Sequence, residues 1–325
     1  MVRLASKKNV DVDTRTPFIW TAVCILLLLV PLFSPRFYVY IFSLIFVTAL
    51  LAMSLNLVVG HGGLYQFHHG VFYGIGAYTY ALLATRTELP VYFGFVAAPL
   101  VSAFFGFLIG LFCVRLTKLY FGMLQISLGS LIWAVAFRWY ALTGGDDGIH
   151  GVPVPDLLQS PKEIYYFTLI VLGACLFVLY RILNSPFGTT LWAIRDNPER
   201  CSAVGIDVRR HRMVAIVISA FFAGVAGALF VMVEGSVFPD LLFWVLSLEI
   251  FIMCLLGGWY TFAGPMLGAA VIVSLRTFAG TYTEYWTSIL GIILILLIFF
   301  LPEGIMGFLE KKLGSSKEGK GRARA

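Results

Sequence analysis

The sequence predicts an all-α polytopic membrane protein, a bundle of about ten transmembrane helices. Apolar residues make up 60% of the 325 positions and charged residues only 12%, and the mean hydropathy is +0.91. A soluble domain carries roughly a quarter charged residues, so this composition excludes one. The apolar runs approach about 20 residues, which is typical of membrane-spanning helices; a barrel would show alternating strands of about ten residues.

Ten apolar runs are the expected spans, and they follow a polar, basic N-terminal tail over residues 1–17. The runs are Phe18–Phe33, Phe37–Val59, Gly70–Ala84, Val91–Val114, Phe121–Leu142, Ile164–Ile182, Met213–Val233, Phe243–Leu256, Pro265–Ala279 and Tyr285–Leu301. They define a transmembrane permease domain over 18–308, followed by a basic tail over 309–325. The first run has no small-residue cleavage site and another span follows at once, so it predicts an uncleaved helix rather than a signal peptide.

Basic residues indicate how the chain crosses the membrane. Alternation from a cytoplasmic N-terminus places Arg115, the loop from Arg181 to Arg212 and the lysine-rich tail in the cytoplasm, as the positive-inside rule requires. The same alternation places the acidic loop Thr143–Glu163 outside and both ends of the chain inside. Arg138 and Arg276 fall near the outer ends of their spans, where we expect their side chains to snorkel toward the interface.

The basic loop carries signals for a short helix over Pro198 to Val204, within a coupling loop over 184–212. The signals are an N-cap, a first-turn proline, an acid at the positive helix start and a closing glycine: Asn197, Pro198, Glu199 and Gly205. Cys201 and Val204 are expected on one face of this helix. Such a helix could press into the groove of a soluble partner, and the alternative is an ordinary solvated connector.

Two spans, Gly70–Ala84 and Pro265–Ala279, are short, and similar glycine-rich phrases precede them: Gly62-Gly63-Leu64-Tyr65-Gln66-Phe67 and Gly257-Gly258-Trp259-Tyr260-Thr261-Phe262. Short, Gly-interrupted segments point to a translocation site, because broken helices expose backbone groups at membrane depth. The matching phrases also suggest an internal repeat, parallel on this segmentation and inverted if one span is miscounted. The residues that we expect here to line a translocation path are Gly62, Gly63, Gln66, His69, Gly74, Gly257 and Gly258.

Glu249 lies in the middle of an apolar run, where a carboxylate costs on the order of 3 kcal/mol. We therefore expect it to face the bundle interior with a partner, either on the translocation path or in a structural hydrogen bond. His61, His68 and His69 cluster before the third span, but the Gly62-Gly63 pair disfavours the continuous helix that would align them, and no metal site is predicted. Residues 314–321 are similar to a phosphate-binding loop but lack its final Ser or Thr, so no ATPase activity is predicted for this chain.

Five phrases in order resemble the permease subunits of branched-chain amino acid ATP-binding-cassette (ABC) importers, specifically the larger of the two permeases. The phrases are Leu55-Asn56-Leu57 through Gly74-Ile75-Gly76-Ala77-Tyr78; Thr143-Gly144-Gly145 with Asp147-Gly148 and Gly151-Val152-Pro153; Ala193-Ile194-Arg195 through Gly205-Ile206-Asp207-Val208; Ser247-Leu248-Glu249 with Leu256-Gly257-Gly258 and Gly264-Pro265; and Pro302-Glu303-Gly304 with Gly307. The resemblance implies a cytoplasmic Glu-Ala-Ala-x-x-x-Gly loop that contacts an ATPase. Glu199 and Gly205 stand at that spacing, although Arg200 and Cys201 replace the alanines. The expected ATPase-coupling residues are Arg195, Asn197, Pro198, Glu199, Arg200 and Gly205.

The same resemblance implies the rest of an importer in a bacterial plasma (inner) membrane. Its other parts would be a second, related permease, two cytosolic ATPases that use ATP and Mg, and an extracytoplasmic solute-binding protein. His69 matches a family histidine with a structural role, whereas Leu64, Gln66 and His68 depart from the usual Gln, Ser and Gly. The expected cargo is branched-chain amino acids or a similar small polar solute, with urea, short amides or aromatic acids as alternatives. An ion-coupled secondary transporter, with Glu249 as its coupling group, and a membrane enzyme built on the histidines are the readings from other classes.

Overall fold

The computed structural model describes residues 26–116, 118–282, 285, 288, 291–292 and 304–308. Both predicted tails, the phosphate-loop-like stretch, half of the first predicted span and most of the tenth lie outside the described residues. The α-helices are α2 (Arg36–Asn56), α3 (His69–Arg86), α4 (Val91–Cys113), α5 (Lys118–Arg138), α6 (Tyr140–Thr143), α7 (Pro161–Leu183), α8 (Pro186–Asp196), α9 (Pro198–Ala203), α10 (Val208–Glu234), α11 (Trp244–Gly257) and α12 (Gly264–Tyr282). A π-helical turn η1 (Leu57–His61) extends α2, and three 3₁₀ turns, η2 (Gly145–Asp147), η3 (Asp156–Leu158) and η4 (Pro239–Leu242), lie in loops. Residues 26–33 and 304–308 are also helical.

Five helices in the described part of the chain are long and apolar enough to cross a membrane: Arg36–His61, Val91–Cys113, Tyr120–Arg138, Pro161–Leu183 and Val208–Glu234. The polytopic helical class is therefore as predicted, but the count of about ten spans is not confirmed. The short spans predicted over 70–84, 243–256 and 265–279 form α3, α11 and α12, which are not among the five. The span predicted to run to Leu142 stops at Arg138, and Gly144, with a φ of +79°, closes the short helix α6 after it.

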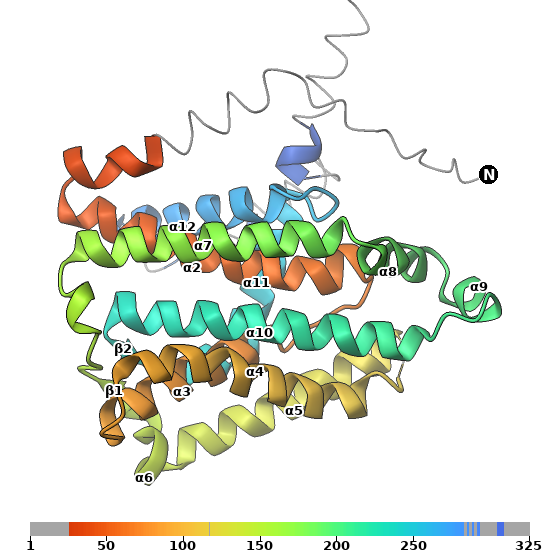
Figure 1. Cartoon of the computed structure of the whole chain (residues 1–325), viewed down its shortest axis with the longest axis horizontal. Coiled ribbons are helices and arrows are strands. Elements are labelled where there is room, and N and C mark those ends of the chain that lie inside the picture. The colour runs from red at the N-terminus through yellow and green to blue at the C-terminus, as the bar shows by residue number, and fades with distance from the viewer. Residues whose placement is uncertain are drawn as a thin grey trace, which may run out of the picture.

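Two helices form the centre of the bundle. In the most apolar windows of the α2–η1 and α10 spans, 78% and 72% of the residues are buried, against 17–33% in α4, α5 and α7. The outer helices thus keep apolar faces for lipid, as a membrane solvent requires. Figure 1 shows α2, α4, α7 and α10 running side by side along the long axis of the bundle.

The α3–α10 contact is so close that no side chain separates the two backbones. A Cβ on Gly76 would lie 2.5 Å from the Cα of Gly224, and a Cβ on Gly227 would meet the backbone of Tyr73 and Ala77. Ser102 on α4 donates a hydrogen bond to the Phe72 carbonyl at 2.7 Å, so α4 joins the same packed unit. Small residues at such positions allow helices to associate without a hydrophobic driving force.

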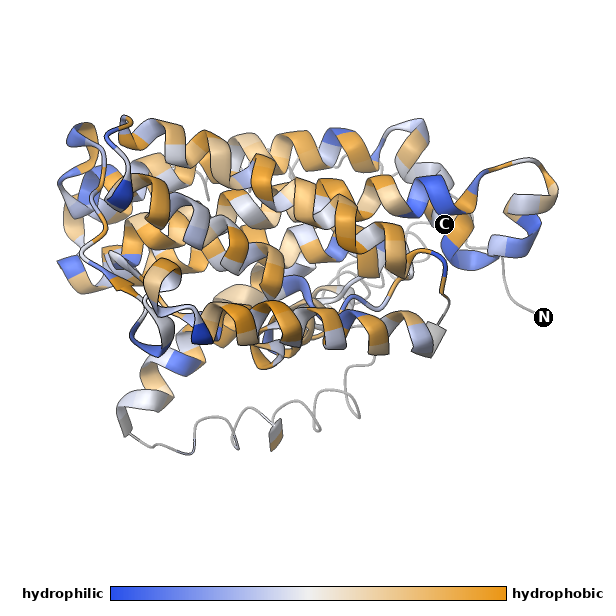
Figure 2. Ribbon diagram, turned by 90° about the horizontal axis from the view of Figure 1, so that it is seen from below, coloured by the Kyte–Doolittle hydropathy of each residue, from blue (hydrophilic) through white to orange (hydrophobic). Residues whose placement is uncertain are grey.

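The two ends of the bundle differ in structure. At one end the strands β1 (Ile149–His150) and β2 (Ser236–Val237) pair antiparallel, with Ile149 opposite Val237, and tie the loop after α6 to the loop after α10. At the other end α8 and α9 project from the bundle (Figure 1). Figure 2 shows hydrophilic residues gathered at both ends and hydrophobic residues along the helices between them. This pattern places a membrane around the middle of the bundle.

Candidate functional site

The projecting segment contains the short helix that the sequence predicts. The Asn197 side chain accepts a hydrogen bond from the Arg200 backbone N–H at 2.9 Å, and Pro198 occupies the first turn. Gly205 has a φ of +91°, which favours glycine, and the chain turns back there. The helix ends at Ala203, with Val204 as its C-cap, rather than including Val204.

Cys201 and Val204, expected on one face of this helix, differ sharply in exposure. Cys201 is 7% exposed and Val204 is 82% exposed. The cause is the turn at Gly205, after which the Ile206 N–H donates to the Cys201 carbonyl at 3.0 Å and the returning chain lies near Cys201. The exposed residues of this segment include Glu199, Arg200, Ser202 and Val204.

Helix α8 was not predicted, although its signals stand in the sequence. The Ser185 hydroxyl accepts a hydrogen bond from the Gly188 N–H at 3.5 Å, and Pro186 follows it at the first helical position. Leu191 and Ile194 of α8 are fully buried, so the helix packs on the bundle by one face. Because only Asn197 separates α8 from α9, the packing of α8 on the bundle also attaches α9 to the core.

Arg195, at the end of α8, points into the bundle. Its guanidinium donates a hydrogen bond to the carbonyl oxygen of Gly60. The same guanidinium lies 4.4 Å from the ring centroid of Tyr260 and 5.5 Å from that of Trp192. Gly60 lies in η1, just before the first glycine-rich segment, and Tyr260 lies in the second, so one side chain joins α8 to both places.

Both glycine-rich segments interrupt helices, as predicted. The helical path of α2 and η1 ends at His61, and α11 ends at Gly257. Gly63 has a φ of +65°, and a Cβ there would lie 2.7 Å from the Cγ of Arg195. Gly258 has a φ of +108°. Glycine at position 63 is therefore required both by the backbone and by the close approach of Arg195.

The histidines near the first break pack on aromatic rings or on a hydroxyl. His61 lies edge-on to Trp192 at 5.6 Å and His68 edge-on to Phe72 at 4.7 Å. His69 Nε2 is 2.8 Å from the Ser54 hydroxyl. Among the residues that the structure describes, no group of three or more His, Cys, Asp or Glu side chains is placed to hold a metal.

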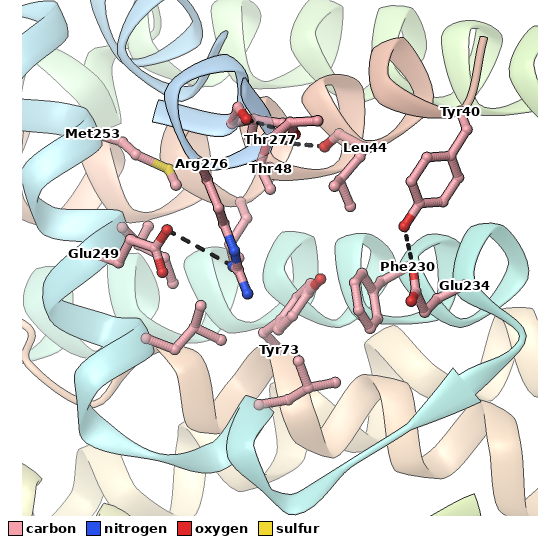
Figure 3. A pocket seen from close by; sticks show the side chains of 15 residues that line it. Tyr40, Leu44, Thr48, Tyr73, Phe230, Glu234, Glu249, Met253, Arg276 and Thr277 are labelled. Carbon is pink, nitrogen blue, oxygen red and sulfur yellow. Dashed lines mark hydrogen bonds and ion pairs between the residues drawn. The ribbon is translucent and has the colours of Figure 1, made fainter. Parts of the chain in front are cut away.

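A cavity of about 370 Å³ opens between α2, α3, α10, α11 and α12. Glu249 lies inside it with 14% of its side chain exposed, and a carboxylate oxygen is 3.9 Å from Nη1 of Arg276 on α12. At the end of the cavity near β2, the Tyr40 hydroxyl donates a hydrogen bond to the Glu234 carboxylate at 2.5 Å. Figure 3 shows the ion pair Glu249–Arg276 and the hydrogen-bonded pair Tyr40–Glu234 pointing into the same space. Leu51, Ile250 and Met253 form an apolar wall beside Glu249.

Only one residue of the predicted translocation set, Glu249, lines this cavity. Gly62, Gly63, Gly257 and Gly258 lie at the helix breaks, and Gln66 and His69 are fully buried beside them. Gly74 packs on η4, where a Cβ would lie 2.5 Å from Leu242 Cδ2. Tyr40 and Glu234 are not predicted as site residues by the sequence. Arg276, expected to snorkel, is paired with Glu249 in the structure.

The structure is an apolar helical bundle with a charged cavity between its helices, and α8 and α9 project at one end. This arrangement is that of a membrane permease. The chain belongs to the family described as "Branched-chain amino acid transport system / permease component", whose profile matches residues 37–300.

Two curated relatives carry the name "High-affinity branched-chain amino acid transport system permease protein LivM". The chain is 29% identical to the protein of Salmonella typhimurium over 310 residues, which cover 87% of this chain and 73% of the relative. It is 29% identical to the protein of Escherichia coli K12 over 319 residues, 90% of this chain and 75% of the relative. The permease protein LivH of Escherichia coli K12 is 26% identical over 285 residues, covering 80% and 91%. No solved structure shows a significant match to the chain.

Proposed function

We propose that this chain is the larger permease subunit of an ABC importer for branched-chain amino acids in a bacterial plasma membrane, with both termini in the cytoplasm. The importer also contains a second, related permease, two cytosolic ATPases and an extracytoplasmic binding protein. The ATPases alone use ATP and Mg. The names of the relatives and the matched family support this assignment. Within this chain the observation that carries it is the charged cavity in an otherwise apolar bundle.

The cavity suits a zwitterion with an aliphatic side chain. A volume of about 370 Å³ falls within the roughly 300–1,000 Å³ of small-molecule sites. Glu249 offers a carboxylate to an ammonium group, and Arg276 offers a guanidinium to a carboxylate. The apolar wall of Leu51, Ile250 and Met253 would take the aliphatic side chain. Because Tyr40 and Glu234 stand at the end that carries β1 and β2, the cavity would receive solute from outside.

Coupling to the ATPases would pass through α9, α8 and Arg195. An ATPase groove would hold α9 by Glu199, Arg200 and the exposed Val204. A shift of α9 moves α8, because only Asn197 separates the two helices. Arg195 then carries the shift to Gly60, just before the first helix break, and to Tyr260, just after the second. Broken helices can change direction at such points without loss of regular hydrogen bonds.

Uptake by the reconstituted complex tests the assignment. Proteoliposomes that contain this chain with its partner permease and ATPases would receive a leucine-loaded binding protein outside and ATP inside. We expect leucine uptake that stops without ATP. Glu249→Gln, which keeps the size of the side chain, would lower uptake at least tenfold, the equivalent of about 1.4 kcal/mol. Leu267→Gln, on the exposed side of α12, serves as the control for adding a polar amide.

Two outcomes would contradict the proposal. Leucine uptake driven by a proton or sodium gradient with no ATPase present would make the chain an ion-coupled transporter. Full leucine uptake by a Glu249→Gln, Arg276→Gln double variant would remove the cavity from the path. Uptake of urea or phenylalanine in preference to leucine would retain the importer but replace its substrate.

A further inference from the structure

A second hollow lies at the end of the bundle that carries α8 and α9, on the outer surface between α4 and α10. It has a volume of about 560 Å³. Three arginines surround its mouth: Arg115 after the end of α4, and Arg209 and Arg210 in the first turn of α10. The walls below them are apolar and include Phe107, Leu111, Met213 and Val217. The groove is thus strongly cationic at its mouth and apolar along its walls.

The arginines are not neutralised by the groove itself. All three are exposed, and no ion pair involving them occurs within the described ranges. The nearest acid in the chain, Asp207, caps α10 by accepting the Arg210 backbone N–H at 3.0 Å. Arg209 and Arg210 also add their charges to the positive end of the α10 dipole, which favours an external anion there.

The depth of the groove matches a leaflet of the bilayer. Phe107 stands eight residues before Arg115, and Val217 stands seven residues after Arg210. At 1.5 Å per residue of α-helix, the apolar walls extend roughly 10–12 Å below the charges. The hydrocarbon half of a bilayer is about 15 Å deep. Phe107 and Leu111 remain 44% and 40% exposed, so the walls face outward.

We propose that this groove binds an anionic phospholipid of the cytoplasmic leaflet. The headgroup phosphate would lie among Arg115, Arg209 and Arg210, and an acyl chain would run along the α4–α10 walls. A soluble ATPase would not reach an apolar wall at this depth. A transmembrane helix would need its own carboxylates to meet the arginines. An anionic lipid supplies the phosphate and the hydrocarbon in one molecule.

This site would have a consequence for transport, which rests on the proposed function for its cytoplasmic placement. Arg209 and Arg210 follow the projecting segment directly, and α10 is packed on α3 without intervening side chains. A lipid held there would fix the depth of the α10 start in the membrane while α9 moves with the ATPase. Lipid binding itself can be measured whether or not the chain transports an amino acid.

The test uses the full permease complex in phosphatidylcholine nanodiscs, titrated with phosphatidylglycerol and analysed by native mass spectrometry. An arginine near the membrane surface contributes about 1 kcal/mol toward an anionic lipid, or about fivefold in affinity. We expect Arg210→Gln to lower apparent affinity about fivefold and the triple variant R115Q/R209Q/R210Q on the order of 100-fold. Arg181→Gln, exposed at the same end of α7, is the matched control and should leave affinity unchanged.

A second variant separates the groove from a general surface charge. Val217→Trp keeps all three arginines and fills the space between the walls, so it should also lower phosphatidylglycerol retention. Equal retention by the triple variant and the native chain would overturn the proposal, as would an equal loss in Arg181→Gln. Loss of the partner permease from the complex in Val217→Trp, with lipid retention unchanged, would identify the groove as a subunit interface instead. Co-purification and gel filtration of each variant verify folding.

Discussion

Replacing Arg195 by alanine should uncouple ATP hydrolysis from transport. The change removes the hydrogen bond to the Gly60 carbonyl and the stacking over Tyr260 at 4.4 Å. A hydrogen bond from a charged donor contributes about 1.5–3 kcal/mol, and a cation–π contact about 0.5–2 kcal/mol. The combined loss is about 2–5 kcal/mol. If the lower value is the coupling free energy between α8 and the helix breaks, the coupling factor falls about 30-fold.

The assay compares ATP hydrolysis and leucine uptake in the same proteoliposomes, as solute transported per ATP hydrolysed. We expect Arg195→Ala to keep hydrolysis near the native rate and to lower this ratio about 30-fold. Arg195→Lys retains the charge without the planar guanidinium and should recover part of the ratio. Arg181→Ala, at the end of α7, removes an exposed arginine from the same side of the bundle and should have no effect.

The same contact can be disturbed from the opposite side. Gly63→Ala places a Cβ 2.7 Å from the Cγ of Arg195 and strains a φ of +65°, so it should reproduce the uncoupling. Gly235→Ala strains a φ of +72° with nothing within 4 Å and provides the control. A native ratio in Arg195→Ala would refute the reasoning. Loss of the ATPases from the Arg195→Ala complex would show instead that Arg195 serves subunit assembly.

The remaining predictions concern packing and exposure. Gly76→Leu should destabilise the bundle by about 1–3 kcal/mol, because its side chain would meet the α10 backbone at Gly224. Gly173→Leu is the control and should not destabilise the bundle, since a Cβ there would have nothing within 4 Å. Equal melting temperatures of the two variants in detergent would contradict this packing. Val204→Cys should react rapidly with a maleimide and be protected when the ATPases bind, while the native Cys201 thiol reacts slowly because it is buried. Fast labelling of Cys201 in the native chain would show that the turn at Gly205 does not cover it.

Local signals were sufficient for the projecting helix. Asn197, Pro198 and Gly205 act on their immediate neighbours, and the structure has each in its predicted local role. The same type of signal at Ser185 and Pro186 marks α8, which the sequence analysis overlooked because it treated the residues before Asn197 as loop. The helix breaks at Gly62 and Gly257 were likewise predictable from glycine alone.

Contacts between distant segments could not be predicted in this way. Nothing near Arg195 in the sequence indicates that it reaches Gly60 and Tyr260, because the pairing depends on how α8 packs on the bundle. Glu249 was expected to need a partner, but Arg276 became that partner only through the packing of α11 on α12. The difference in exposure between Cys201 and Val204 was not predictable for a related reason, since the chain beyond the helix decides which of them is covered.

The fused backbones of α3 and α10 determine which part of the permease can move. With Gly76 against Gly224 and Gly227 against Tyr73, sliding one helix along the other would force carbonyls and Cα atoms into overlap. These two helices therefore form a rigid unit, which provides the cavity wall that contains Tyr73 and Glu234. The opposite wall is formed by α11, which ends at Gly257, and α12, which begins at Gly264, so we expect the movement to occur between these helices and the α3–α10 pair. Alternating access in this subunit would then be a movement of α11 and α12, which carry Glu249 and Arg276, relative to the rigid α3–α10 pair.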